Sequence, residues 1–582
     1  MTTNVIAANS KVRPTTTLAL LFLGLAVALP GPNLRAQTTP PADITITGEG
    51  ADDDFGWQVA PAGDVNGDGV QDVIIGAPSN DFVAGFAGRA YLFYGPFTGN
   101  INAADADAII SAQAFGDNLG FSVASAGDVN NDGFDDIIVG ARSNDKRGIQ
   151  SGRVYLFYGP LDGSLAATDA DAIISGAAFD ELGRAVAPAG DLNGDGFDDI
   201  LLGTDIAGGS FQGQVFLFNG PLFGQRTAAS ADAIITGSFS NESFGASVAS
   251  AGDVNGDGIN DVIVGAPRFP LNGADTGRAY VFFGPIAGSM IATEADAIIF
   301  GEAINDGFGR SVAAAGDVNG DGADDVIVGA DQLFNQGAGK AYVFDGPLAG
   351  NIQAADASAI LIGEVAQDGF GISVSGVEDF NADGFDDVIV GAWDNDGGGG
   401  GGRSGRAYTF FGPFTGTIAA AEADFIVTGA PSDELGMSVA GGDLNGDGVG
   451  DLIIGAPQFA DGDPGYGAIF FGVQENALVL TLTPRSPPIV IPPAGGSFRY
   501  NLDLVNGSDE TRTLDIWMAL TGPGTNRIVR QFSRTLAPGG SFHRSFTQRI
   551  PGSARAGTYS FTGNAGTFPA AEVSDSFIFE KQ

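Results

Sequence analysis

The chain of 582 residues has no cysteine and only one histidine, His543. Without cysteine it cannot form disulfides, thiolate zinc sites, iron–sulfur clusters or a thiolate nucleophile, and one histidine excludes His-rich metal sites and repeated imidazole catalysis. His543 lies between Phe542 and Arg544 on a predicted strand, so we expect an ordinary half-buried residue. Helical periodicity of useful length is also missing. Most familiar active sites are therefore excluded.

Basic residues are scarce as well, with 26 Lys and Arg against 70 Asp and Glu and a net charge of −44. The imbalance is concentrated in residues 37–474, which hold 62 acidic and 13 basic residues, a net charge near −49. Such a surface repels phosphate backbones and anionic lipids, so we expect no nucleic-acid partner and no membrane insertion. Solubility or a salty habitat explains the acidity as well as a partner does.

The N-terminal segment has the pattern of a secretory signal peptide. Lys11 and Arg13 precede a 12-residue apolar run, LALLFLGLAVAL, which is followed by a plausible cleavage point after Ala36. A membrane-spanning helix needs about 20 apolar residues, so an uncleaved anchor fits this run less well. We expect residues 1–36 to be a signal peptide and the mature protein to be secreted or attached to the cell surface, with the periplasm as an alternative.

One nine-residue pattern, D-x-N-x-D-G-x-x-D, recurs seven times at intervals of 62 to 64 residues. Around each copy lie four short segments with strand character, separated by Gly, Pro, Asn and Asp turn signals. In the fourth copy these are residues 232–235, 244–249, 261–265 and 278–284. Four strands per unit, repeated radially, predict an all-β fold with a seven-bladed β-propeller over residues 37–474.

The two ends of this array favour a closed ring. A DITIT segment, Asp43–Thr47, precedes the first unit, whereas the seventh unit stops after Ala468–Gly472 with no equivalent fourth strand. We expect the N-terminal strand 43–47 to complete the last blade and so hide the sheet edges that an open array would expose.

Two further motifs flank each acidic pattern, shown by Phe55-Gly56 and by Gly76-Ala77-Pro78 in the first copy. Together with the acidic pattern they resemble the FG-GAP repeats of the integrin alpha-subunit propeller, over roughly residues 43–472. Some copies differ: a leucine replaces the phenylalanine in three of them, and Gly203-Thr204-Asp205 replaces GAP in another. The resemblance implies calcium in the hairpin between the two motifs, and ligand-binding loops at the opposite face.

The acidic pattern also has the composition of a calcium loop. Calcium takes six to eight oxygen ligands, and here positions 1, 3, 5 and 9 present side-chain oxygens while position 7 offers its backbone carbonyl. A plain hairpin turn would not need further carboxylates at fixed offsets. Dockerin loops are followed by a helix and thrombospondin-type loops recur at shorter intervals, so neither fits. We expect up to seven Ca²⁺ ions.

The predicted ligands share these five positions in each of the seven copies. They are Asp64, Asn66, Asp68, Val70, Asp72, Asp128, Asn130, Asp132, Phe134, Asp136, Asp191, Asn193, Asp195, Phe197, Asp199, Asp253, Asn255, Asp257, Ile259, Asp261, Asp317, Asn319, Asp321, Ala323, Asp325, Asp379, Asn381, Asp383, Phe385, Asp387, Asp443, Asn445, Asp447, Val449 and Asp451.

The last part of the chain, residues 475–582, differs in kind. It has 8 acidic and 10 basic residues, no acidic loop and several segments of alternating apolar and polar residues, such as SFRYNLDLV. This pattern predicts a small immunoglobulin-like β-sandwich. It is similar to modules appended to secreted bacterial proteins.

These features predict a secreted, calcium-binding adhesion or recognition protein whose propeller presents variable loops to a cell-surface or matrix protein or glycan. A passive structural component of an envelope or matrix is an alternative. A carboxylate-dependent, glycan-active enzyme fits less well, because no catalytic pair can be identified and sialidase-type boxes are absent. We expect a protein that is not an enzyme and name no catalytic or ligand-contacting residue.

A second open question concerns the basic residues that begin the third strand of five units: Arg89, Arg153, Arg278, Lys340 and Arg406. They could line a channel for a ligand, or they could pair with neighbouring acidic side chains.

Overall fold

The computed structural model describes residues 41–582, apart from 208, 269, 272–273, 333–335, 397–401, 459–461, 473–477, 486–488, 507–511, 537–540 and 568–569. The predicted signal peptide, residues 1–36, lies outside the described part. The described residues are folded into β-strands and six one-turn 3-10 helices: Ala103–Asp105, Ala167–Asp169, Ala228–Ser230, Ala292–Glu294, Ala354–Asp356 and Ala420–Glu422. The prediction of an all-β fold is thus confirmed. In this part of the chain, no helix is long and apolar enough to cross a membrane.

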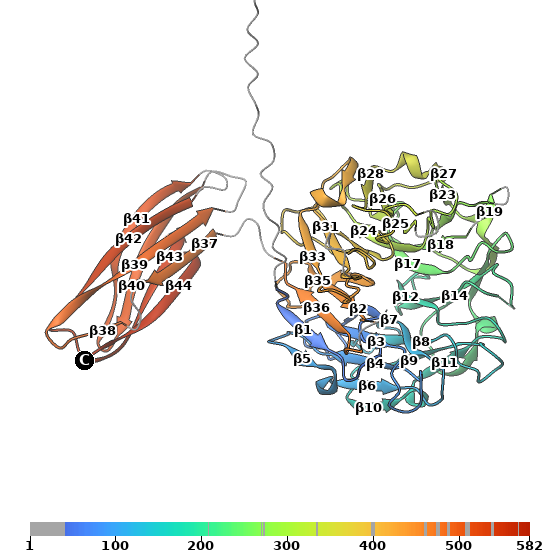
Figure 1. Cartoon of the computed structure of the whole chain (residues 1–582), viewed down its shortest axis with the longest axis horizontal. Helices are drawn as coiled ribbons and strands as arrows, with labels where there is room; N and C mark the ends of the chain where they lie inside the picture. The colour runs from blue at the N-terminus through green and yellow to red at the C-terminus, as the bar shows by residue number, and fades with distance from the viewer. Residues whose placement is uncertain are drawn as a thin grey trace, which may run out of the picture. The chain divides into compact units, whose positions relative to one another are not determined.

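Seven sheets of four or five strands repeat along the first part of the chain (Figure 1). In the first four sheets the strands are β2 (Gln58–Gly63), β3 (Asp72–Ala77), β4 (Arg89–Phe93), β6 (Ala108–Ser111) and β10 (Gly163–Ala166); β7 (Leu119–Gly127), β8 (Asp136–Ala141), β9 (Arg153–Phe157), β11 (Ala172–Ser175) and β15 (Gly224–Thr227); β12 (Ala185–Gly190), β13 (Asp199–Thr204), β14 (Gln214–Phe218), β16 (Ala233–Thr236) and β22 (Gly288–Ile291); and β17 (Ser247–Gly252), β18 (Asp261–Ala266), β21 (Arg278–Phe282), β23 (Ala297–Phe300) and β27 (Gly350–Gln353). A small hairpin of β19 (Pro270–Leu271) and β20 (Ala274–Asp275) lies between β18 and β21 in the chain.

The other three sheets follow the same plan. Their strands are β24 (Ser311–Gly316), β25 (Asp325–Ala330), β26 (Lys340–Phe344), β28 (Ala359–Ile362) and β32 (Gly416–Ala419); β29 (Val374–Gly376), β30 (Val388–Ala392), β31 (Arg406–Phe410) and β33 (Phe425–Thr428); and β34 (Ser438–Gly442), β35 (Asp451–Ala456), β36 (Tyr466–Phe470), β1 (Ile44–Thr47) and β5 (Ile101–Asn102).

The sheets are arranged as a ring. The innermost strands contact one another in the order β2, β7, β12, β17, β24, β29 and β34, and β34 contacts β2 again. In Figure 1, β2, β7, β12 and β17 lie around the centre of the ring. In the last sheet β1 lies antiparallel to β36, with Ile44 opposite Ile469 and Thr47 opposite Tyr466. This arrangement is a β-propeller.

In the described residues, six of the seven sheets contain more than the four antiparallel strands that the sequence predicts. A short fifth strand from the following repeat joins the outer edge in parallel, as β27 does beside β23. These outer strands have sequences such as GSMI and GNIQ, and their side chains are mostly exposed. Because they lack an apolar pattern, propensity and periodicity do not reveal them.

Glycines hold neighbouring sheets close together, which explains why both motifs contain this residue. A Cβ atom at Gly76 would lie 2.0 Å from the carbonyl oxygen of Gly120 in the next sheet. The same approach recurs between all neighbouring sheets, including the last and the first, where a Cβ atom at Gly455 would lie 2.1 Å from the carbonyl oxygen of Gly56. Separations this short exclude any side chain. The glycines therefore permit direct backbone contact around the ring.

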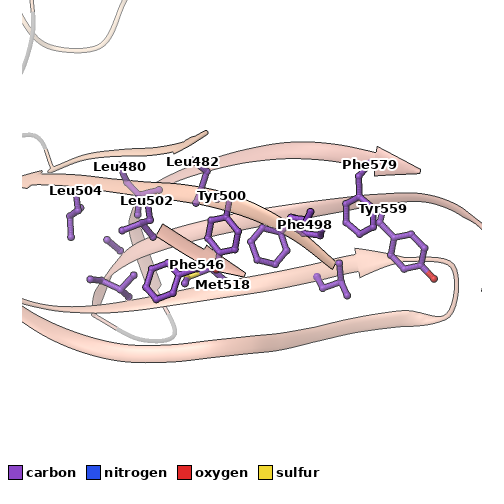
Figure 2. Close-up of a cluster of buried hydrophobic side chains, with 14 of the residues drawn as sticks. Leu480, Leu482, Phe498, Tyr500, Leu502, Leu504, Met518, Phe546, Tyr559 and Phe579 are labelled. Atoms are coloured by element: carbon purple, nitrogen blue, oxygen red, sulfur yellow. The ribbon is translucent and has the colours of Figure 1, made fainter. Parts of the chain in front are cut away.

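The rest of the described chain forms two further sheets. The first contains β37 (Leu478–Pro484), β39 (Gly495–Asn506) and β42 (Ser541–Pro551), and the second β38 (Val490–Ile491), β44 (Ala570–Lys581), β43 (Gly557–Thr567), β40 (Arg512–Gly522) and β41 (Thr525–Leu536). Side chains from both sheets, among them Tyr500, Met518 and Phe579, share one buried cluster (Figure 2). The sheets therefore form a small β-sandwich, as the fold prediction states.

Candidate metal loops and recognition face

The seven acidic patterns occupy equivalent loops, each joining the first and second strands of its sheet. In the loop of the first sheet, the backbone amides of Asp68 and Gly69 donate to the two carboxylate oxygens of Asp64, at 2.9 and 2.8 Å. The amide of Val70 donates to Asp68 Oδ1 at 3.0 Å. The same three bonds are present in the other six loops. The backbone thus fixes the carboxylates at positions 1 and 5.

The carboxyl group at position 9 is fully buried in every loop: Asp72, Asp136, Asp199, Asp261, Asp325, Asp387 and Asp451. In the first loop Asp72 Oδ2 accepts a hydrogen bond from the backbone amide of Val65 at 2.9 Å. Its Oδ1 accepts one from the backbone amide of Gly95, also at 2.9 Å. Equivalent pairs recur in the other six loops. Position 9 therefore ties the loop to the end of the third strand.

Burial raises the pKa of the position-9 carboxyl groups far above the ordinary value for aspartate. The pKa of Asp72 is raised to about 7 and that of Asp136 to about 8, chiefly by desolvation. The charges at positions 5 and 1, such as Asp68 and Asp64, raise it further. A cation beside these groups would relieve this repulsion and favour the ionised form.

The donor set in these loops suits a hard cation, because it consists of carboxylate, amide and carbonyl oxygens with no imidazole or thiolate. Val65, at position 2, is fully buried and packs into the core of the propeller. The predicted ligands of each copy therefore lie in one loop. Among the described residues, no group of three or more Asp, Glu, His or Cys side chains converges closely enough to hold a metal ion. The loops thus have ligand chemistry for calcium but keep their carboxylates hydrogen-bonded to the backbone.

Position 8 contributes a contact that the sequence analysis missed. Asp135 Oδ2, in the second loop, accepts the backbone amide of Asp64 in the first at 2.7 Å, and the amide of Asp135 donates to the carbonyl of Asp64 at 3.1 Å. The same reciprocal pair joins Asp128 to Asp198, and further pairs join Asp253 to Asp324 and Asp317 to Asp386. Neighbouring loops are therefore linked directly through their first positions.

The opposite end of each sheet carries the FG segments and the loops between the second and third strands. Phe55, Phe244, Phe308 and Phe370 are fully buried, and their rings meet tyrosines of the third strand edge-on, as Phe244 meets Tyr280 at 5.4 Å between centroids. Leucines at this position in the other sheets are buried as well. The FG segment also pairs with the preceding sheet, for example Phe308 with Gly277. These loops therefore lie together at one end of the propeller.

A second set of repeated acids lies two residues before each FG or LG pair: Asp53, Asp117, Asp180, Glu242, Asp306, Asp368 and Asp433. All seven are buried. In six of them the carboxylate accepts the backbone amide of the residue three positions earlier, as Glu242 does from Phe239 at 3.1 Å. Burial raises the pKa of Glu242 to about 7. These acids shape the loop that enters the first strand, and their constant offset from FG was a signal that sequence analysis could have used.

Three of the five basic residues that begin the third strands pair with acids, which favours pairing over a charged channel for these three. Arg89 Nη1 lies 2.8 Å from Glu49 Oε2. Lys340 and Arg406 make the same contact with Glu302 and Glu364, each at 2.7 Å. Arg278 instead stacks on Phe300 at 4.3 Å. The cavity along the propeller axis is lined by other residues, which follow the FG pair, such as Trp57, Phe121 and Met437.

Exposed large apolar side chains gather at the FG end. They occur in the loops that enter the first strands (Phe115, Phe179, Phe239, Ile304 and Val365) and in the loops after the second strands (Phe82, Val83, Phe86, Ile149 and Phe211). Of these, Phe115 and Phe82 expose 74% and 73% of their surface. In the described part of the propeller, only Phe223 and Ile291 are comparable residues outside these loops. We call this set of ten residues the apolar rim.

Comparison with known proteins supports the repeat assignment. The FG-GAP repeat model matches residues 55–93, 119–157, 182–218, 244–282, 308–344 and 435–470. The copy between residues 371 and 434 is not matched, although its acidic loop, from Asp379 to Asp387, makes the same hydrogen bonds as the others.

Integrin alpha chains are among the relatives. Integrin alpha-5 of Xenopus laevis is 31% identical over 224 residues, which cover 36% of this chain and 20% of that protein. Integrin alpha pat-2 of Caenorhabditis elegans is 32% identical over 250 residues, covering 40% and 19%. Integrin alpha-IIb of Mus musculus is 37% identical over 154 residues, covering 25% and 15%. The chain thus spans about a fifth or less of the length of these relatives.

A solved structure, a mutant β-glucosidase from Listeria innocua in complex with laminaribiose, covers 21% of this chain and 18% of its own at 14% identity, with a TM-score of 0.15. That score is too low to carry an argument. The repeat match, the integrin relatives and the ring of sheets agree with one another: the chain contains FG-GAP repeats, and its β-propeller resembles that of the integrin alpha chains.

Proposed function

We propose that this protein is a secreted adhesion or recognition protein that binds a cell-surface or matrix ligand through the FG end of its propeller. The apolar rim is the observation that carries this proposal. Exposed apolar residues concentrated on one face of a folded protein usually mark an interaction surface. The integrin alpha relatives support a role in adhesion. The buried acids before each FG pair help to fix the conformation of the loops that carry the rim.

We further propose that the acidic loops bind calcium and that calcium stabilises the propeller. The ligands would be the carboxylates at positions 1, 5 and 9, the side-chain oxygen of the asparagine at position 3 and the backbone carbonyl at position 7. A bound divalent cation would offset the negative charges that raise the pKa of the position-9 carboxyl groups. Because position 8 links neighbouring loops, stabilising one loop would also stabilise the next.

The remaining assignments are proposals of the same kind. We propose residues 37–474 as the propeller domain and residues 475–582 as an immunoglobulin-like module, with residues 1–36 as an export signal. We propose a binding role in place of an enzymatic one, since neither set of repeated acids forms an exposed pair at a substrate-sized cavity: the acids at position 9 and those before FG are buried.

The direct test is binding of the mature protein to glycans, matrix proteins and cell envelopes in millimolar calcium. The variant Phe115→Ser/Phe239→Ser removes two residues of the apolar rim and should weaken binding at least tenfold. The matched control is Phe223→Ser, an exposed aromatic residue near Gly220, whose amide contacts Asp199 of an acidic loop. Equal binding by both variants would exclude the apolar rim as the binding surface, whereas no binding by a protein shown to be folded would favour the passive structural role.

A further inference from the structure

The FG end also contains a pocket of distinctive composition. A cavity of about 570 Å³ opens between the loops of the third, fourth and fifth sheets. Its volume lies in the range of small-ligand sites. The residues that define its chemistry are Phe211, Asn241, Arg268, Asn305, Arg310 and Asp331.

Two arginines make this pocket positive within a strongly acidic propeller. The guanidinium of Arg268 lies 5.3 Å from the ring centre of Phe211, and Arg310 Nε lies 3.6 Å from Asp331 Oδ2. A guanidinium has five N–H donors in a planar fork, so one distant carboxylate does not use its full capacity. Arg310 also keeps 38% of its side chain exposed. Both side chains can therefore reach a ligand.

Further arginines extend the positive region to the central channel. Arg184 lines the channel together with Arg310, and Arg142 stacks on Phe121 at 3.9 Å. Thus four of the thirteen basic residues between positions 37 and 474 lie at this one entrance. Desolvation lowers the pKa of Arg310; the charge of Asp331 opposes this shift, and the charges of Arg184 and Arg268 add to it.

Acidic side chains offset only part of this charge. Asp205 pairs with Arg184 at 3.2 Å, Asp331 lies beside Arg310, and Glu181 faces Arg142. Four arginines therefore face three carboxylates, and an anionic group is the natural complement of the remaining charge.

Two asparagines give the pocket neutral hydrogen-bonding groups. Asn241 and Asn305 occupy equivalent positions, each three residues before the phenylalanine of its FG pair. Both have left-handed backbone angles, with φ of 66° and 60°, a conformation that asparagine adopts more readily than most residues. Each side-chain amide carries donors and an acceptor, which suits hydroxyl groups.

We propose that this pocket binds a carboxylated sugar, such as a uronic acid unit of an acidic glycan. Arg268 and Arg310 would hold the carboxylate, Phe211 would cover an apolar face of the sugar ring, and Asn241, Asn305 and Asp331 would bond its hydroxyl groups. An acidic peptide side chain would need only the arginines and leave the other polar groups unused. The proposal rests on the recognition role of the FG end and names its ligand class.

Isothermal titration of the mature protein in millimolar calcium tests this proposal. The probe is an oligosaccharide of alternating glucuronic acid and N-acetylglucosamine, and the matched control is the same oligosaccharide with its carboxylates reduced to alcohols. We expect the reduced form to bind at least tenfold more weakly. Triglutamate serves as an acidic peptide probe and should also bind at least tenfold more weakly than the acidic oligosaccharide.

The variants assign the binding to this pocket. Arg310→Gln should weaken binding of the acidic oligosaccharide at least tenfold, and Asn305→Ala about threefold. Since Arg310 contacts Asp331, the exposed Arg268→Gln provides a second variant that leaves this ion pair in place. Arg147→Gln, an exposed arginine in the second sheet's loop, is the control and should bind like the parent.

Equal binding of the acidic and reduced oligosaccharides, binding unaffected by Arg268→Gln and Arg310→Gln, or no binding at all would each overturn the proposal. Preferential, arginine-dependent binding of triglutamate would overturn it in favour of a protein ligand. Attachment to matrix or cells is measured in parallel. If Phe115→Ser/Phe239→Ser abolishes attachment while Arg268→Gln does not, the recognition role stands and only the sugar pocket fails.

Discussion

The two ends of the propeller are built from the same repeat but differ in what they keep constant. At the acidic end, all seven loops share one set of backbone hydrogen bonds to positions 1, 5 and 9. At the FG end, the buried acid and the apolar FG position recur, but the exposed residues change from sheet to sheet: Phe115, Ile304 and Val365 occupy similar loops. The acidic end thus repeats one set of hydrogen bonds in every loop, whereas the FG end presents different exposed residues on the same buried framework.

Removing calcium should have the largest effect on stability, and it should act only through the loops of the acidic end. If each loop binds with a Kd near 0.1 mM, about 1 mM calcium stabilises it by about 1.4 kcal/mol, or about 10 kcal/mol over seven loops. That is comparable with the stability of a whole domain. Thermal unfolding in calcium and in chelator measures the loss.

Single variants assign this loss to the loops. Asp257→Asn keeps an acceptor for the amide of Ile259 but removes a charge, so calcium should stabilise it by about 1.4 kcal/mol less than the parent. Asp81→Asn changes an exposed acid in the loop between β3 and β4 and should leave the calcium effect intact. If chelator leaves the melting temperature unchanged, the calcium assignment is wrong.

The glycine contacts between sheets provide the next largest effect. In Gly265→Ala the new Cβ would lie 2.1 Å from the carbonyl oxygen of Gly309, so the two sheets must move apart. We expect a loss of about 3 kcal/mol, at the upper end for overpacking. Urea unfolding measures it. Gly496→Ala, where the nearest heavy atom is 3.4 Å away, is the control and should cost far less.

The buried acids of the FG end predict a pH dependence. The pKa of Glu242 is about 7 in the folded protein and near 4.5 when unfolded, so the folded state holds a proton that the unfolded state releases between these values. Stability should therefore fall as the pH rises through this window, by about 2 kcal/mol between pH 5 and 7.5. Glu242→Gln cannot titrate and should lack this fall in stability with pH. The measurement is the urea midpoint of the variant and of the parent at pH 5 and at pH 7.5, in calcium. Equal slopes would contradict the assignment.

The smallest effect on stability is expected at the exposed rim itself. Phe115→Ser changes a side chain that is 74% exposed, and substitutions at such positions usually alter stability by less than about 0.5 kcal/mol. Thermal unfolding in calcium checks this. A larger loss would show that the rim contributes to folding and would weaken the contrast between the two ends.

The repeating part of this structure could be predicted from sequence because it depends on local patterns. The turn and apolar residues specify an all-β propeller, and the fixed offsets of the acidic loops place their residues in equivalent loops. Buried Val65 and Phe55 follow from the same patterns. These features need only the residues of one repeat.

Other features depend on contacts between repeats and could not be predicted in this way. The parallel fifth strands have exposed polar sequences, such as Gly350–Gln353, and form only beside the preceding sheet. The contact of Asp135 with Asp64 crosses from one loop to the next. Arg268 and Arg310 lie 42 positions apart and share no motif, so only the fold brings them to one pocket. The buried acids before FG were accessible to sequence analysis and were overlooked.

The pairing of β1 with β36 also has a consequence for how the propeller is made. The amide of Phe471 donates to Asp43 Oδ2, which joins residues 428 positions apart in the chain. Synthesis releases the N-terminal strand first, and its partner strand exists only after the last repeat has been completed. During that interval Ile44–Thr47 lacks its antiparallel partner, β36. The ring is therefore closed by pairing its first strand with its last, and a chain that stops one repeat short has no antiparallel partner for its first strand.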